Sequence, residues 1–434
     1  MEGILDLAKR SAEEAEVYVV TIDETPVAFE ANRLKTLETK QSVSVSLRIV
    51  RNGRIGFAST TGFGNPQALV DMAVETAEFG AEARFVLPPA QQYPGIEVYD
   101  PEVETLSIED MVDFGRSLIE AVRSHTPELV CEAGVTKGMV TEDIVNSQGG
   151  QSSYRKSFCH AGMEGTLVRD TDMLFVGEIE SSCHPLRESG PLAESVIHQL
   201  DLAKRTATVP TGRLPVILTP KGVRGVFLPP LAAAFNGKLV VQQASPLAGR
   251  QGERIFDERV SVCDDATVDY RPSSRPCDDE GVPSRKTPLV LQGVVHDFLY
   301  DLQTAGQAGV ESTGSAARGR GSMPAPSISA LVFEEGDTGF ADMVADIKAG
   351  LVVETLIGAG QGNILGGDFG GNVLLGYKVE NGEIVGRVKD TMVSGNVYDV
   401  MNELVAIGDE AVWVGHPLKA PALYLANVSV ASKV

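Results

Sequence analysis

The chain has 434 residues, with 59 acidic and 37 basic side chains and a formal net charge of −22. Hydrophobic residues make up 43% and charged residues 22%, which is typical of a folded globular protein and excludes a disordered chain. The acidity also argues against direct nucleic-acid binding, because binding to a phosphate backbone needs clustered Lys and Arg. The length favours two or three domains.

The cellular location is predicted from three features that the sequence lacks. No apolar stretch reaches the ~20 residues that span a bilayer, and the acidic start Met1–Asp6 lacks the basic and apolar regions of a signal peptide. The five cysteines are an odd number without CxxC spacing, which argues against a disulfide framework and a zinc ribbon. We therefore expect a cytoplasmic protein with no membrane contact and with buried free thiols.

In chain order, the first elements combine helices with strands. Apolar residues at helical spacing predict an amphipathic helix from Ile4 to Ala15. Alternating residues in Val43–Ile49 predict a half-buried strand, and Asn52-Gly53 predicts a hairpin turn into the next strand. Asn65-Pro66 marks the start of another helix, with Asn65 as the N-cap.

Further elements complete the first half of the chain. Ser107 with Asp110 predicts a capping box at the start of a third amphipathic helix. Strand-like stretches follow to about Phe175, and a helix is predicted over Pro191–Arg205. Residues 1–207 thus indicate an N-terminal α/β domain of sheet and amphipathic helices.

The second half, residues 208–434, changes character. Glycine becomes frequent, and short β-type runs recur at Pro215–Leu218, Leu289–Leu291, Asn372–Val379, Glu383–Val388 and Ala422–Val430. This pattern favours a β-rich C-terminal domain that could close as a barrel. The whole chain is therefore predicted to be α+β.

Eight segments of the second half follow one another at characteristic spacing: Ser245–Glu253, Val262–Asp265, Asp279–Pro283, Asp301–Ala305, Ser312–Arg318, Gly366–Phe369, Val393–Asn396 and Ile407-Gly408. In this order they resemble the TldD/PmbA family, the so-called modulators of DNA gyrase, and within it the PmbA (TldE) branch. Weaker likeness at Asn146–Gly149 and in the opening helix extends the resemblance over nearly the whole chain.

The resemblance implies a peptidase made of two kinds of subunit, in which a TldD-type subunit and a TldE-type subunit degrade or trim unfolded peptides. The TldD-type subunit carries a zinc-binding HExxxH motif. Anchored on Gly225–Leu228, the motif's histidines fall on Pro229 and Ala234 and its glutamate on Pro230. The resemblance therefore implies no catalytic residue and no metal in this chain, with zinc in the TldD-type partner.

Histidine and proline placement support that expectation. No histidine occurs between His198 and His296, so a shift of the alignment by a few residues supplies no imidazole. Two consecutive prolines inside a helix would remove amide donors and clash with the preceding turn, at ~3 kcal/mol or more. We therefore expect Pro229-Pro230 to open a short helix over Leu231–Phe235.

An acidic segment is a candidate for a cation-binding site. It contains Asp264, Asp265, Asp269, Asp278, Asp279 and Glu280. Spacing for an EF-hand is absent, so a solvated loop with Asx turns is favoured over a cation site. Asp279-Glu280-Gly281 matches the family, which implies a place along the peptide channel or at the partner interface.

The glycine-rich run Gly358–Gly367 matches neither GxGxxG nor a P-loop, and so predicts turns where backbone approaches backbone or an extended peptide. Ser312-Thr313-Gly314 lacks a GxSxG elbow, which favours a backbone-capping turn over a nucleophile. The residues expected to contact substrate or partner are Asp279, Glu280, Gly281, Ser312, Thr313, Gly314, Arg318, Gly366, Gly367 and Asp368.

Three functions remain open from the sequence. The favoured hypothesis is a non-catalytic subunit that shapes the substrate channel of a TldD–TldE-type zinc metallopeptidase. The alternative is a stand-alone homodimer that binds unfolded peptides without cleaving them. The third is a hydrolase that uses an acidic cluster near Asp264 and Asp279.

Overall fold

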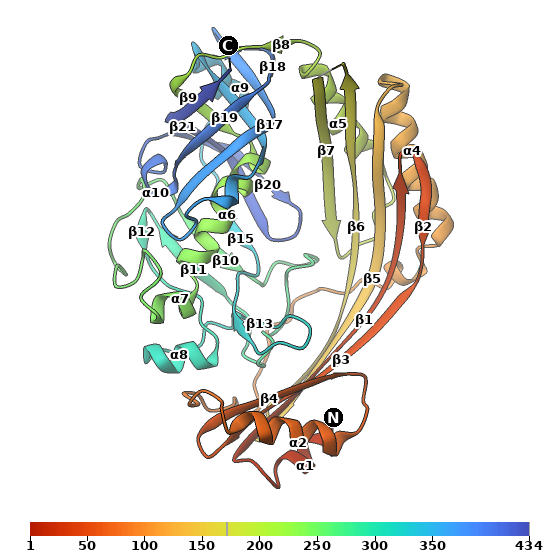
Figure 1. Cartoon of the computed structure of the whole chain (residues 1–434), viewed down its shortest axis with the longest axis vertical. Coiled ribbons are helices and arrows are strands. Elements are labelled where there is room, and N and C mark those ends of the chain that lie inside the picture. The colour runs from red at the N-terminus through yellow and green to blue at the C-terminus, as the bar shows by residue number, and fades with distance from the viewer. Residues whose placement is uncertain (171, 434) are drawn as a thin grey trace.

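The structure is a computed structural model that describes residues 1–170 and 172–433. Helices hold 22% and strands 43% of the chain, so the predicted α+β class is confirmed. Figure 1 shows a long curved sheet with helices, built from the first part of the chain, beside a β-rich body built from the second part.

The first part forms a seven-stranded antiparallel sheet in the order β4-β3-β1-β5-β6-β7, with β2 paired to β1. Its elements are α1 (Glu2–Ala8), β1 (Glu14–Glu30), β2 (Arg33–Leu37), β3 (Lys40–Arg51), β4 (Arg54–Thr61), α2 (Pro66–Ala77), α3 (Glu102–Thr105), α4 (Ile108–His125), β5 (Val130–Asn146), β6 (Gln151–Arg169), β7 (Asp172–Ser182) and α5 (Gly190–Leu202).

Local signals account for several of these elements. Asn52 and Gly53 adopt φ of +51° and +71°, as the predicted hairpin turn requires. The side chain of Asn65 accepts hydrogen bonds from the first turn of α2, and Ser107 forms the predicted capping box with Asp110 at the start of α4. These three predictions are confirmed.

The opening helix is shorter than predicted, since α1 ends at Ala8. Ala15 instead lies in β1 opposite Ile49, and its amide donates to Ser147 Oγ at 3.0 Å. Pairing across the sheet therefore overrides the helical spacing of small residues around Ala12.

The two faces of the N-terminal sheet have different neighbours. On one face, β1 and β3 bury aliphatic side chains such as Val17 and Leu47 against α1 and α2. On the opposite face, Glu16, Tyr18, Val20 and Ile22 of β1 are paired with Arg48, Ser46, Ser44 and Ser42 of β3. This second face, called the junction face below, is turned toward the C-terminal half (Figure 1).

The C-terminal elements are β8 (Thr206–Ala207), β9 (Gly212–Leu218), α6 (Pro220–Ala234), α7 (Gly237–Val241), β10 (Val262–Asp265), β11 (Lys286–Leu291), β12 (Val294–Val295), α8 (Leu302–Ala308), β13 (Ala316–Ala317), β14 (Ala325–Pro326), β15 (Leu331–Phe333), α9 (Phe340–Asp346), β16 (Ala349–Ile357), the 3₁₀ turn η1 (Ala359–Gln361), β17 (Asp368–Glu380), β18 (Glu383–Val388), β19 (Thr391–Asn396), α10 (Val397–Val400), β20 (Leu404–Val414) and β21 (Leu418–Ser432).

Five of these strands close into a barrel. β21 pairs with β9, β9 with β16, β16 with β17, β17 with β19, and β19 with β21 again. The barrel-like architecture predicted for the second half is thus confirmed, and closure removes the open edges that these strands would otherwise present.

The cysteines and the helices were each the subject of a prediction from the sequence. All five cysteines are buried and unpaired. No helix in the described part of the chain is long and apolar enough to cross a membrane.

Candidate functional site

Helix α6 carries Pro229, Pro230 and Ala234, the positions where the family resemblance places the zinc-binding motif of the TldD branch. It runs from Pro220 to Ala234, with Thr219 as the N-cap, and contains Pro229 and Pro230 in its interior. The expected short helix beginning at Leu231 is therefore wrong.

Packing explains why α6 continues through the two prolines. Each proline removes an amide donor that would bond to the carbonyl four residues earlier. However, Val226, Phe227 and Leu231 are almost fully buried in the core shared with the barrel. Burial of each such side chain stabilises the fold by about 1.5–3 kcal/mol, so several of them together outweigh the helix defect.

The residues at the motif positions do not fit a zinc ion. The side chains of Pro229, Pro230 and Ala234 carry no ligand atom, and Ala234 is completely buried within the apolar core. Within residues 1–170 and 172–433, no three His, Cys, Asp or Glu side chains gather closely enough to hold a metal ion. We therefore assign no hydrolytic step to α6.

The chain's charged candidates gather elsewhere, between the N-terminal sheet and the C-terminal half. Seven buried side chains form what we call the charge cluster: Glu16, Arg48, Arg275, Asp278, Asp279, Glu280 and Arg318. Glu16 and Arg48 come from the junction face of β1 and β3, and the other five come from C-terminal segments. The cluster thus joins the two halves.

Arg48 is the centre of one part of the cluster. Its Nη2 donates to Glu16 Oε2 at 3.0 Å, and its Nη1 pairs with Glu280 Oε1. The other carboxylate oxygen of Glu16 pairs with Arg318, and the amide of Leu302 donates to Glu280 Oε2 at 2.7 Å. Every carboxylate oxygen of Glu16 and Glu280 therefore has a donor, as buried charges require.

Asp279 organises the other part of the cluster. Arg275 Nη1 donates to Asp279 Oδ1 at 2.7 Å, and the amide of Arg318 donates to Asp279 Oδ2 at 2.6 Å. The neighbouring Asp278 accepts the amides of Glu280, Val282 and Ala316 at 2.9–3.0 Å. These bonds fix the backbone of the acidic segment.

The pKa values follow from burial and from the number of counter-charges. Three guanidinium groups face four carboxylates, so one carboxylate lacks a full counter-charge. Burial alone would raise the pKa of Glu16, but Arg318 and Arg48 outweigh it and hold that pKa below its ordinary value. Burial raises the pKa of Glu280 to about 8, although Arg48 opposes the shift.

The expectation of a solvated acidic loop is wrong for Asp264, Asp278, Asp279 and Glu280, all of which are buried. Arginine side chains and backbone amides replace water around them. The Asx turns are present, because Asp278 Oδ1 accepts the amide of Glu280 two residues on. Both carboxylate oxygens of Asp278, Asp279 and Glu280 already accept hydrogen bonds, which argues against a hydrolase that uses these residues to activate water.

Gly281 and the segment Ser312-Thr313-Gly314 serve as turns. Gly281 adopts φ +74°, and its carbonyl accepts a hydrogen bond from Tyr93 of the N-terminal half at 3.2 Å. Thr313 Oγ1 accepts the amide of Tyr300 at 2.7 Å, which is the backbone-capping role expected for this segment. At Gly314, with φ +70°, a Cβ would lie 2.6 Å from a backbone oxygen, so only glycine fits.

Gly366, Gly367 and Asp368 lie far along the chain from the charge cluster, where β17 begins. Asn396 Nδ2 donates to the carbonyl of Gly366 at 2.8 Å and to Asp368 Oδ1 at 2.9 Å. Gly367 has φ +85° and lies against the ring of Tyr398, where a Cβ would clash. The structure thus brings the two family segments 366–369 and 393–396 together, as turn and strand partners.

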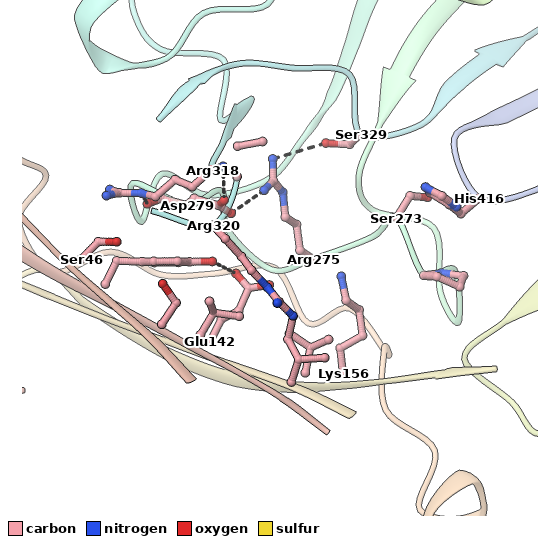
Figure 2. A pocket seen from close by; sticks show the side chains of 18 of the residues that line it. Ser46, Glu142, Lys156, Ser273, Arg275, Asp279, Arg318, Arg320, Ser329 and His416 are labelled. Carbon is pink, nitrogen blue, oxygen red and sulfur yellow. Dashed lines mark hydrogen bonds and ion pairs between the residues drawn. The ribbon is translucent and has the colours of Figure 1, made fainter. Parts of the chain in front are cut away.

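A cavity of about 320 Å³ lies beside the charge cluster, between the junction face and the C-terminal loops (Figure 2). Asp279 and Arg318 line it, whereas Glu280 and Gly281 do not. A second cavity, of about 620 Å³, lies between β7 and α5 on one side and the start of α6 and the end of β20 on the other.

Sequence reasoning missed Glu16, Arg48 and Arg275. Arg48 alternates with apolar residues in the strand Val43–Ile49, which suggests a solvent-facing side chain, yet it is 1% exposed. One feature of the sequence could have indicated that this face is buried. The polar residues that precede Arg48 on the same face of the strand are the small side chains Ser42, Ser44 and Ser46. Small hydroxyl residues allow close approach of another part of the chain, unlike the long charged residues of a solvated face.

The comparisons with known proteins cover nearly the whole chain. The family model described as PmbA/TldA metallopeptidase C-terminal domain matches residues 211–432, and that of PmbA/TldA metallopeptidase domain 1 matches residues 15–77. An uncharacterized protein of Methanocaldococcus jannaschii is 26% identical over 94% of this chain and 95% of its own length.

Relatives of the two branches align over different lengths. A metalloprotease PmbA homolog of Haemophilus influenzae is 22% identical and covers 94% of this chain and 90% of its own. A TldD homolog of the same organism is 28% identical, but covers only 50% of this chain and 45% of its own. The crystal structure of TldE from Thermococcus kodakarensis has the same fold, with a TM-score of 0.89 at 22% identity and full coverage of both chains.

Proposed function

This chain belongs to the PmbA/TldD metallopeptidase family, and from that premise we propose that it is a non-catalytic, PmbA/TldE-like subunit of a two-component zinc metallopeptidase. In this proposal a TldD-type partner holds the zinc and the water-activating residues. The present chain closes and shapes the channel through which unfolded peptides reach them.

The observation that carries the proposal is helix α6. The helix and its barrel are complete, but the motif positions Pro229, Pro230 and Ala234 offer no metal ligand. A zinc hydrolase needs ligands on a fixed element that leave one position open for water. A family fold with this element rebuilt as apolar packing supports a role in binding and assembly.

The lengths of the alignments support the PmbA/TldE branch. The PmbA homolog aligns over nearly all of this chain, whereas the TldD homolog aligns over about half of it. Both relatives are named as metalloproteases, and that activity is extended to this chain only as part of the proposed complex.

The sheet edge formed by β7 supports the handling of extended peptides. Among the described strands, β7 pairs only with β6, whereas β20 pairs with β21 and also bonds through residues 407–409 to the backbone of residues 336–338. Ile179 and Ser181 of β7, and Trp413 of β20, line the cavity of about 620 Å³. Edge strands with free amides and carbonyls can hold a peptide without regard to most of its side chains.

The proposal includes a cytoplasmic location, because five buried, unpaired thiols suit a reducing compartment. It includes heterodimer formation with the TldD-type partner. Any influence on DNA gyrase would then act through turnover of a peptide.

The test uses the purified full chain, the TldD-type subunit from the same cell, and an unfolded polypeptide substrate. We expect the pure chain to carry no stoichiometric zinc by elemental analysis and to cleave nothing. Adding the partner should give cleavage that a chelator abolishes, and a partner lacking its HExxxH histidines should give none. Chelator-sensitive cleavage by the pure chain would overturn the proposal.

The same experiment distinguishes the proposed subunit role from the alternative of a stand-alone homodimer. If the chain binds unfolded peptides as a homodimer and neither associates with the partner nor changes its cleavage rate, the subunit role fails. Size-exclusion chromatography with light scattering measures the assembly, and the cleavage rate measures its consequence.

A further inference from the structure

The cavity beside the charge cluster has a charge opposite to that of the chain. Its lining includes the four basic side chains Lys156, Arg275, Arg318 and Arg320 and the two carboxylates Glu142 and Asp279. Arg275 and Arg318 are paired within the charge cluster, whereas Lys156 and Arg320 form no ion pair in the described part of the chain. The whole chain carries a net charge of −22, so this local excess of positive charge runs against the composition. A cavity lined by one sign of charge attracts ligands of the other sign.

Two cations that line this cavity, Lys156 and Arg320, form no ion pair within the described residues. Lys156 projects from β6 toward the C-terminal loops that carry Arg275 and Ser273 (Figure 2). Its only hydrogen-bond partner in the described part of the chain is the carbonyl of Ser274, at 3.4 Å, and no carboxylate pairs with it there. Burial lowers the pKa of Lys156, and the negative charge of Glu142 opposes that shift only in part.

Other cavity-lining residues carry buried donors that are not used. Arg275 Nε, Arg318 Nη1 and Ser273 Oγ are buried and have no hydrogen-bond partner among residues 1–170 and 172–433. Buried polar groups are nearly always satisfied, by protein, by water or by a ligand. Donors of this kind together with an unpaired ammonium group suit a ligand with several acceptor lone pairs and negative charge.

The cavity continues along the junction face as a trough. A neighbouring cavity of about 430 Å³ shares Val20, Ile22, Ser44 and Arg320 with it. Along the trough, Val20 and Ile22 of β1 pair with Ser44 and Ser42 of β3, so apolar and hydroxyl side chains lie side by side. Small serines leave a depression that the cations close at one end.

We propose that this trough binds an extended peptide segment with a carboxylate seated beside Lys156 and Arg275. The carboxylate belongs either to the peptide's C-terminus or to an acidic side chain. The hydroxyl and aliphatic groups of β1 and β3 contact the rest of the segment. The proposed function contributes only the peptide nature of the ligand; the charge preference comes from this cavity.

The test measures binding to the isolated full chain, without the partner, by fluorescence anisotropy. The probes are a labelled pentapeptide with a free C-terminal carboxylate, the same peptide as its C-terminal amide, and an amide that carries one glutamate. We expect the free acid or the glutamate peptide to bind about 10–100-fold more tightly than the plain amide, because a charge-assisted hydrogen bond is lost.

Variants assign the effect to the site. Lys156→Met should weaken binding of the acidic peptide about 10–100-fold, and Lys156→Arg should retain most of it. Lys378→Met, on the barrel strand β17, makes the same change in net charge elsewhere and should leave binding unchanged. Because Lys156 is half-buried and forms no ion pair within the described residues, Lys156→Met should keep or raise the thermal midpoint, an outcome that a purely structural lysine would not give.

The outcomes separate this inference from the proposed function. Equal binding of acid and amide peptides, or unchanged binding by Lys156→Met, would overturn it. Binding of inorganic phosphate without binding of any peptide would overturn the peptide assignment as well. If the acidic peptide binds through Lys156 but the partner restores no cleavage, the site stands and the subunit role fails.

Discussion

Helix α6 and the junction face of β1 and β3 are both buried, but α6 buries apolar side chains whereas the junction face buries charged ones. The helix holds the positions aligned with a metal-binding motif, yet it is apolar and packed into the barrel core. The junction face holds Glu16 and Arg48, which are buried and form an ion pair with each other. The contrast teaches that buried charge in this chain marks the contact between its halves, whereas α6 serves as an apolar packing element.

The sharpest test of that contrast removes the central cation of the charge cluster. Arg48→Met leaves Glu16 and Glu280 each short of a donor inside the protein. Such a loss costs about 3–5 kcal/mol of the free energy of unfolding. Chemical denaturation at pH 7 measures it, and the surface variant Arg155→Met should cost less than about 1 kcal/mol, because its ion pair with Glu104 is exposed. Similar effects for both variants would contradict the importance of the cluster.

A second test uses pH at Asp264, which is buried and accepts the amides of Ser329 and Ala330 at 2.8 Å. Burial raises the pKa of Asp264 to about 7. The folded state therefore holds a proton that the unfolded state releases above about pH 4, so this group's contribution to stability is lost as the pH rises toward 7.

Asp264→Asn keeps the acceptor oxygen and removes the titration. Between pH 5 and pH 8, the native chain should lose about 2–3 kcal/mol more of its unfolding free energy than the variant does. Asp279 and Glu280 titrate in both proteins, so the difference isolates Asp264. Parallel pH profiles in urea denaturation would refute the assignment.

A third, smaller effect concerns the turn that holds the acidic segment. Gly314→Ala places a methyl group 2.6 Å from the carbonyl oxygen of Pro283 at a positive φ. We expect about 1–3 kcal/mol of destabilisation from strain. Gly225→Ala, within α6, is the matched control, because its methyl group meets no neighbour and should leave stability unchanged or slightly raised. Thermal unfolding of both variants measures the difference.

The smallest expected effect lies in α6 itself. Pro229→Ala restores an amide that can donate to the carbonyl of Gly225, and should raise stability by about 1 kcal/mol. Zinc content should remain unchanged, because no ligand is introduced. A loss of stability on this substitution would mean that the proline ring packs in a way that α6 requires.

Short-range signals account for what could be predicted from the sequence. Asn52-Gly53, Asn65-Pro66 and the Ser107–Asp110 box each act within four residues, and the structure has all three. The short apolar runs of the second half likewise predicted a β-rich domain. Its closure as a barrel depends on the pairing of β19 with both β17 and β21, which the runs themselves do not specify.

Long-range contacts account for what was missed. Arg48 and Glu280 are 232 residues apart in the chain, and Glu16 and Arg318 are 302 apart. No local pattern links such partners, so the acidic segment seemed solvated. The prediction that a helix begins only after Pro229-Pro230 was wrong for a related reason, because the tertiary core around Phe227 outweighs the local preference of proline for a helix start.

Strand β21 determines when the barrel can close during synthesis of the chain. β21 pairs with β9, β15, β19 and β20, so residues 418–432 are the last to be synthesised of all those that hold the barrel together. While the ribosome still encloses them, β9 and β19 present open edges to the crowded cell, and such edges invite mispairing. Nascent chains stalled before residue 418 should therefore be readily digested by proteases in the second half, while the N-terminal sheet is already resistant.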